Sequence, residues 1–69
     1  MRYKVQLMMD NGQSKIVLID GDSEQDVIKR LLMVEAAGLS MNKFSTVVTR
    51  EYNSFTYCVG KLSTIEFLD

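Results

Sequence analysis

The chain has 69 residues, with eight basic and nine acidic side chains, one cysteine, and neither histidine nor proline. A chain of this length predicts one small domain over residues 1–69, whose core contributes only about 3–5 kcal/mol of net stability. The net charge of −1 gives no overall attraction to nucleic acid or anionic lipid. No apolar run approaches the roughly 20 residues of a membrane span, so we expect no membrane partner.

Two apolar, β-branched runs at the start of the chain predict a β-hairpin. They cover Tyr3–Met9 and Ser14–Ile19, and Asn11-Gly12 lies between them. Asn-Gly suits the two central positions of a type I′ turn, because both positions need positive φ. A two-residue loop places Leu7 opposite Ile16. That register leaves three apolar residues on the face away from the helix: Met8, Val17 and Ile19.

The next segment predicts an amphipathic helix from Ser23 to about residue 37. Ser23 and Asp26 have the spacing of a capping box, in which the hydroxyl accepts from a free backbone N–H and the carboxylate reaches back. Gly38 follows as the expected left-handed terminator. The apolar residues recur at helical spacing and fall on one stripe: Val27, Ile28, Leu31, Leu32 and Val34.

Three further strands are predicted in the second half of the chain. They cover Lys43–Tyr52, Phe55–Val59 and Leu62–Leu68, with turns at Asn53-Ser54 and Gly60-Lys61. Neither face of these strands is cleanly apolar, so the sequence leaves open which face they bury. The whole pattern is β-β-α-β-β-β. It predicts an α+β fold in which one antiparallel sheet carries a single helix, residues 23–37, on one face.

A single helix covers only one face of such a sheet, and the uncovered face is where we look for function. Methionine adapts to irregular surfaces, and three of the five methionines, Met8, Met33 and Met41, fall outside the main core faces. The candidate protein interface consists of Met8, Val17, Ile19 and Met33. An edge strand, Lys43–Tyr52 or Leu62–Leu68, offers another route to self-association across a two-fold axis. The competing interpretation is a core wider than one helix stripe.

The C-terminal strands also mix basic and aromatic side chains, which suggests a nucleic-acid-binding face as the alternative function. Aromatic platforms with basic rims stack single-stranded bases. Glu51 and Glu66 lie among the candidates, and structural aromatics with a solvated rim explain the pattern more simply. The candidate face consists of Phe44, Arg50, Tyr52, Tyr57 and Lys61.

We predict no catalytic, cofactor or metal site. Without histidine the commonest general base is missing, and Cys58 lies in a β run as an expected structural thiol. The acidic run Asp20–Asp26 superficially resembles a calcium loop, but its glycine is at position 2 and Leu31 occupies position 12. A turn followed by a capped helix explains this run.

These observations predict a non-enzymatic protein-interaction module that self-associates as a homodimer. The lone thiol and the lack of a recognisable secretory signal indicate a cytoplasmic setting. A small acidic domain without catalytic equipment is a common profile among accessory or regulatory proteins of phages and mobile elements.

Overall fold

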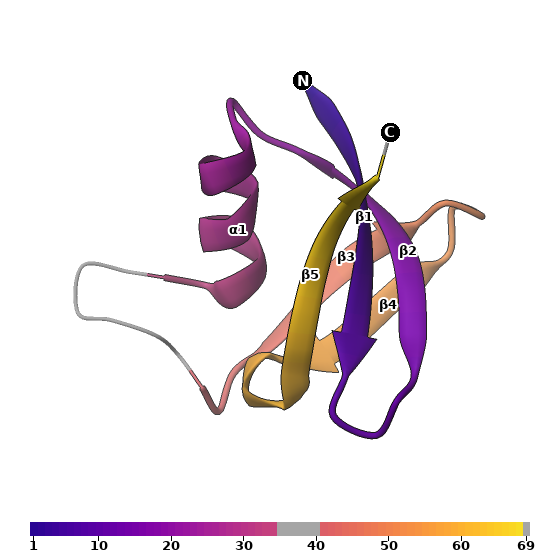
Figure 1. Cartoon of the computed structure of the whole chain (residues 1–69), viewed down its shortest axis with the longest axis vertical. Coiled ribbons are helices and arrows are strands. Elements are labelled where there is room, and N and C mark those ends of the chain that lie inside the picture. The colour runs from indigo at the N-terminus through magenta and orange to yellow at the C-terminus, as the bar shows by residue number, and fades with distance from the viewer. Residues whose placement is uncertain (35–40, 69) are drawn as a thin grey trace.

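The computed structural model describes residues 1–34 and 41–68 of the chain (Figure 1). The elements are β1 (Arg2–Met9), β2 (Ser14–Asp20), α1 (Glu24–Leu32), β3 (Phe44–Thr49), β4 (Ser54–Cys58), the 3₁₀ turn η1 (Val59–Lys61) and β5 (Leu62–Leu68). All strand pairs are antiparallel and follow the order β4-β3-β2-β1-β5. The predicted α+β fold, β-β-α-β-β-β with one sheet and one helix, is confirmed. In the described ranges no helix has the length and apolarity to cross a membrane.

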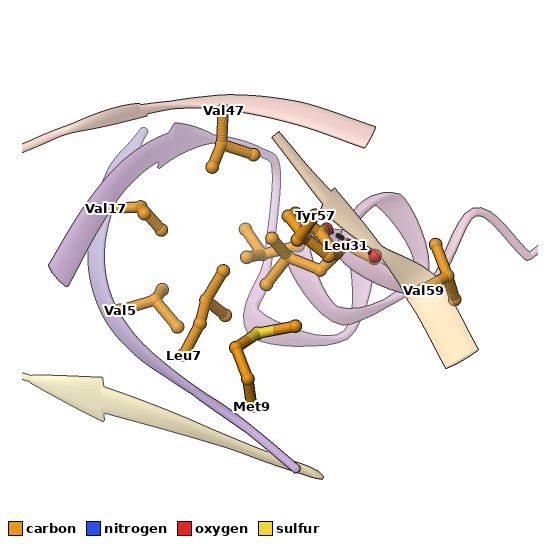
Figure 2. Close-up of a cluster of buried hydrophobic side chains, with 9 residues drawn as sticks. Val5, Leu7, Met9, Val17, Leu31, Val47, Tyr57 and Val59 are labelled. Atoms are coloured by element: carbon orange, nitrogen blue, oxygen red, sulfur yellow. Dashed lines mark hydrogen bonds between the residues drawn. The ribbon is translucent and has the colours of Figure 1, made fainter. Parts of the chain in front are cut away.

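The sheet is curled rather than flat. β2 pairs with β3 at only two positions, Val17 with Thr49 and Leu18 with Val48, so the sheet bends where its two halves join. Figure 1 shows β3 and β4 crossing behind β1 and β2, with α1 beside the sheet. In the close-up of Figure 2, the strands surround a cluster of apolar side chains, and the helix closes the open side.

The hydrogen bond between Met9 and Gln13 closes the turn between β1 and β2. The loop inside this pair, Asp10–Gly12, has three residues and not the two that the sequence suggested. The Met9 N–H donates to the Gln13 carbonyl at 2.8 Å, and the Gly12 N–H donates to the Met9 carbonyl at 3.0 Å. Gly12 has a φ of +87°, which identifies a type I turn followed by a left-handed bulge residue. Val5 therefore pairs with Val17, and the predicted register is wrong by one residue.

This shift directs the opposite face of β2 toward the core. Val17 is fully buried, and Ile16 and Leu18 lie on the outer face instead. The β3 strand buries Val47 and exposes Val48, which settles the face that the sequence left open. The buried apolar core consists of Val5, Leu7, Met9, Val17, Val27, Leu31, Val47, Tyr57 and Val59 (Figure 2).

The helix begins as predicted. Ser23 is the N-cap, and its Oγ accepts from the Asp26 N–H at 3.2 Å. The Asp26 carboxylate accepts from the Asp22 N–H at 3.0 Å and from Arg30 Nε at 3.1 Å. The Ser23 bond satisfies a backbone donor that the first turn leaves free, and the Asp26 carboxylate lies at the positive end of the helix dipole.

The helix ends at Leu32, five residues before the predicted boundary. Met33 takes the left-handed conformation with a φ of 52°, and its N–H donates to the Arg30 carbonyl at 3.2 Å. The Val34 N–H donates to the Lys29 carbonyl at 3.0 Å, which completes a Schellman motif. The predicted terminator, Gly38, lies outside the described residues.

The β3–β4 loop repeats the geometry of the first hairpin. The Thr49 N–H donates to the Asn53 carbonyl at 2.7 Å, and the Tyr52 N–H donates to the Thr49 carbonyl at 2.8 Å. Tyr52 has a φ of 66° and occupies the place that Gly12 takes in the first loop. Its side chain is 73% exposed, so burial does not offset the cost of this conformation.

Leu31→Ala should lower the free energy of unfolding by about 2–5 kcal/mol, because Leu31 is fully buried at the centre of the core. Urea titration followed by circular dichroism measures this change. Lys29→Ala, on the exposed side of the same helix, is the matched control and should unfold like the wild type. An unchanged midpoint for Leu31→Ala would mean that another helix face meets the sheet.

Tyr52→Gly should raise the free energy of unfolding by about 0.5–1 kcal/mol, because glycine adopts positive φ without a Cβ clash. Gly12→Ala, at the equivalent position of the first loop, should lower it by about 1 kcal/mol. Thermal and urea unfolding report both values. A destabilised Tyr52→Gly protein would show that contacts of the ring outweigh its backbone strain.

Candidate interaction surfaces

The four residues of the predicted protein interface do not form one surface. Val17 is fully buried, and Ile19 and Met33 are half-buried and pack against the core. Met8 is 40% exposed and lies on the outer face of the sheet. The assignment of these residues to one uncovered face is wrong, because the three-residue loop places Val17 and Ile19 on the same face as Val5.

The predicted nucleic-acid face is not assembled either. Tyr57 is 3% exposed and belongs to the core, whereas Phe44 is 68% exposed on the outer face. Arg50 and Tyr52 lie in the loop at the far end of β3 from Phe44, and Arg50 Nε contacts the Glu51 carboxylate at 3.1 Å. Lys61 lies in η1, next to the β1–β2 loop.

The outer face of the sheet carries scattered apolar side chains in polar surroundings. A hollow of about 280 Å³ has Leu18 and Val48 as its apolar lining and Tyr52 beside them. Arg2 and Asp20, whose side chains pair at 3.4 Å, complete this lining. Both charged groups are exposed, so the pair adds little binding energy of its own. The exposed large apolar residues of this face are Met8, Phe44, Val48 and Tyr52.

One side of β5 is a free sheet edge. β5 pairs only with β1, so the predicted edge at Leu62–Leu68 is confirmed. The other predicted edge, Lys43–Tyr52, is wrong because β3 lies between β4 and β2. Ile65 and Phe67 point to the core side of the sheet but remain only half-buried. The backbone groups of a free edge and partly covered apolar side chains are together a template for a further strand.

The other free edge belongs to β4 and borders a groove. This groove has a volume of about 490 Å³. Its apolar lining comes from Met9, Phe55 and Tyr57, and its rim comes from the β1–β2 loop, Thr56 and Lys61. The Phe55 and Tyr57 rings stack with centroids 5.9 Å apart, and Lys15 Nζ lies 6.0 Å from the Phe55 centroid.

Little in the sequence predicts this groove. Met9 and Phe55 looked like ordinary strand residues, because the groove forms only when the curled sheet brings the first hairpin opposite β4. The Asp10 N–H donates to the Lys61 carbonyl at 2.9 Å and holds the β1–β2 loop against η1. No local pattern predicts the groove, because Met9 lies on the same face as Leu7 whatever the loop length and meets β4 only through the curl of the sheet.

The titratable groups show structural roles. Burial raises the pKa of Tyr57, and a hydrogen bond with Ser45 opposes this shift. The backbone N–H of Asp22 and then Arg30 lower the pKa of Asp26. The Cys58 thiol is half-buried, with its Sγ 3.6 Å from the Met41 carbonyl. Within residues 1–34 and 41–68, no three His, Cys, Asp or Glu residues gather closely enough to hold a metal ion.

Comparison of the sequence with protein-family models and curated proteins, and of the structure with solved structures, finds no match.

Tyr57→Phe tests the link between α1 and β4. The Tyr57 hydroxyl donates to the Leu31 carbonyl at 2.5 Å, and its loss should cost about 1 kcal/mol at neutral pH. Because the folded pKa lies above the ordinary value of 10.0, the folded chain holds this proton more tightly than the unfolded chain. The resulting stability is complete below pH 10 and falls as the pH rises above it.

Urea titrations from about pH 7 to pH 11 compare the two proteins across this window. The wild type should lose stability above pH 10 more steeply than Tyr57→Phe, which has no proton to release at this position. Equal slopes would contradict the assignment of a buried, proton-holding hydroxyl at this site.

Proposed function

We propose that the protein is a non-enzymatic interaction module that self-associates by pairing β5 with β5 of a second copy. One observation carries the proposal: β5 is a seven-residue edge strand whose Ile65 and Phe67 side chains stay half-buried. A second strand would satisfy the free backbone groups and cover these side chains. The two sheets would then join across a two-fold axis, as isologous contacts require.

The sequence of β5 suits antiparallel pairing with itself. A two-fold axis at the central residue places Ile65 opposite Ile65 of the second copy. The same register places Thr64 opposite Glu66, so no like charges face each other.

The size of the domain favours such an association. A chain of about 60 residues buries only about 60% of the surface that its unfolded form exposes, which leaves the monomer marginally stable. Burial against a second copy adds to this stability in proportion to the affinity of the dimer. The proposal retains the cytoplasmic setting and the accessory or regulatory role in a phage or mobile element. No observation favours the nucleic-acid alternative, because its five residues do not gather.

Charge substitutions at Thr64 test the proposed pairing. Thr64 is exposed and lies opposite Glu66 of the second copy in this register. Thr64→Glu creates two like-charge pairs per dimer and should weaken it by roughly 2- to 30-fold, whereas Thr64→Lys should strengthen it to a similar extent. Light scattering after size exclusion, over a concentration series, measures the fraction with twice the monomer mass of 7.9 kDa.

Thr46→Glu is the matched control, because Thr46 is exposed on the outer face of β3, which is not an edge strand. Thr46→Glu should leave the dissociation constant of the dimer unchanged. Added salt should reduce the difference in dimer affinity between the two Thr64 variants, because it screens exposed charges. A wild type that stays monomeric at millimolar concentration, or equal dimerisation of both Thr64 variants, would refute the proposal.

A further inference from the structure

We infer that the free edge of β4 and the groove beside it form a second docking site, for an extended acidic peptide segment. The peptide would carry one large apolar residue between two acidic residues. This site lies on a different strand from the proposed dimer edge and does not depend on self-association.

The groove runs along the unpaired edge of β4. Three consecutive residues of this strand line it, Phe55, Thr56 and Tyr57. Neighbouring side chains of a strand point to opposite faces, so only a groove along the strand's margin touches all three. No residue of β3 lines it, which places the groove on the side of β4 that has no partner strand. An extended peptide is the ligand form that satisfies such an edge.

The floor of the groove selects an apolar side chain. Met9 and the stacked rings of Phe55 and Tyr57 supply the apolar lining. Phe55 is only half-buried, so part of this lining faces the groove. The volume of about 490 Å³ accommodates a leucine or phenylalanine side chain together with the backbone that carries it.

Lysines at the groove select acidic neighbours for that side chain. Lys61 lies at the η1 end, and Lys15 reaches over the Phe55 ring. The ion pairs among the described residues use Arg2, Arg30 and Arg50, and none uses Lys15 or Lys61. The rim also holds Asp10, whose backbone N–H is bonded to Lys61. Lys61 and Asp10 line the groove, and Lys15 over the Phe55 ring adds a second positive charge beside it, which leaves the site complementary to negative charge.

The test uses a fluorescein-labelled peptide with blocked ends and the sequence Ser-Asp-Phe-Asp-Ser. Fluorescence anisotropy measures its binding, and NMR shift changes of backbone amides locate it. We expect saturable binding, with the largest shifts in β4 and the β1–β2 loop. A peptide with lysine in place of both aspartates should bind roughly 5- to 30-fold more weakly.

Protein variants identify the groove. Lys61→Glu should weaken binding of the Asp peptide roughly 5- to 30-fold, and Lys4→Glu, on the opposite face of the sheet, should leave it unchanged. A peptide with an N-methylated phenylalanine amide should bind more weakly if the edge of β4 donates and accepts backbone bonds. Thr64→Glu should bind the peptide like the wild type, which separates this site from the proposed dimer edge.

Three outcomes would overturn the inference. The first is the absence of saturation at millimolar peptide, and the second is equal affinity for the Asp and Lys peptides. The third is a loss of the protein dimer in Lys61→Glu together with no peptide binding, which would assign this edge to a second copy of the chain.

Discussion

The three-residue loop Asp10–Gly12 fixes the pairing of β1 with β2, and the remaining structure depends on that pairing. Gly12 supplies the left-handed residue that the loop needs, and Val5 then faces Val17 on the concave side of the sheet. The inner faces of β3, β4 and β5 follow, because each strand continues the same sheet. A slip of one residue would move Val17 to solvent and bring Leu18 inside.

The helix covers the concave side of the curled sheet. Val27 and Leu31 fill the concave side, and the Tyr57 hydroxyl joins β4 to the last turn of α1. Two glycines allow the close approaches around this core. A Cβ on Gly21 would lie 2.7 Å from Val27 Cγ2, and one on Gly60 would lie 2.6 Å from the Met41 carbonyl oxygen. The strand order leaves β4 and β5 as the free edges of the sheet, and both proposed interactions use these edges.

Local chemistry predicted the order of elements and the N-cap at Ser23, because each depends on neighbouring residues alone. Of the two edge strands that the sequence suggested, only Leu62–Leu68 lies at an edge, because strand order depends on pairing between distant segments. The register of the first hairpin was missed because Asp10-Asn11-Gly12 suits both a two-residue loop and a three-residue loop with a bulge. The helix end was missed because Met33 takes a left-handed conformation that glycine usually provides. The groove had no local signal, since Met9 and Phe55 meet only through the curl of the sheet.

Cross-strand nuclear Overhauser contacts between backbone protons of β1 and β2 test the register most directly. Directly paired residues in an antiparallel sheet bring these protons close together. The account predicts contacts for Val5 with Val17 and for Leu7 with Lys15. Contacts for Val5 with Leu18 and for Leu7 with Ile16 would contradict it, and would return Val17 to the outer face.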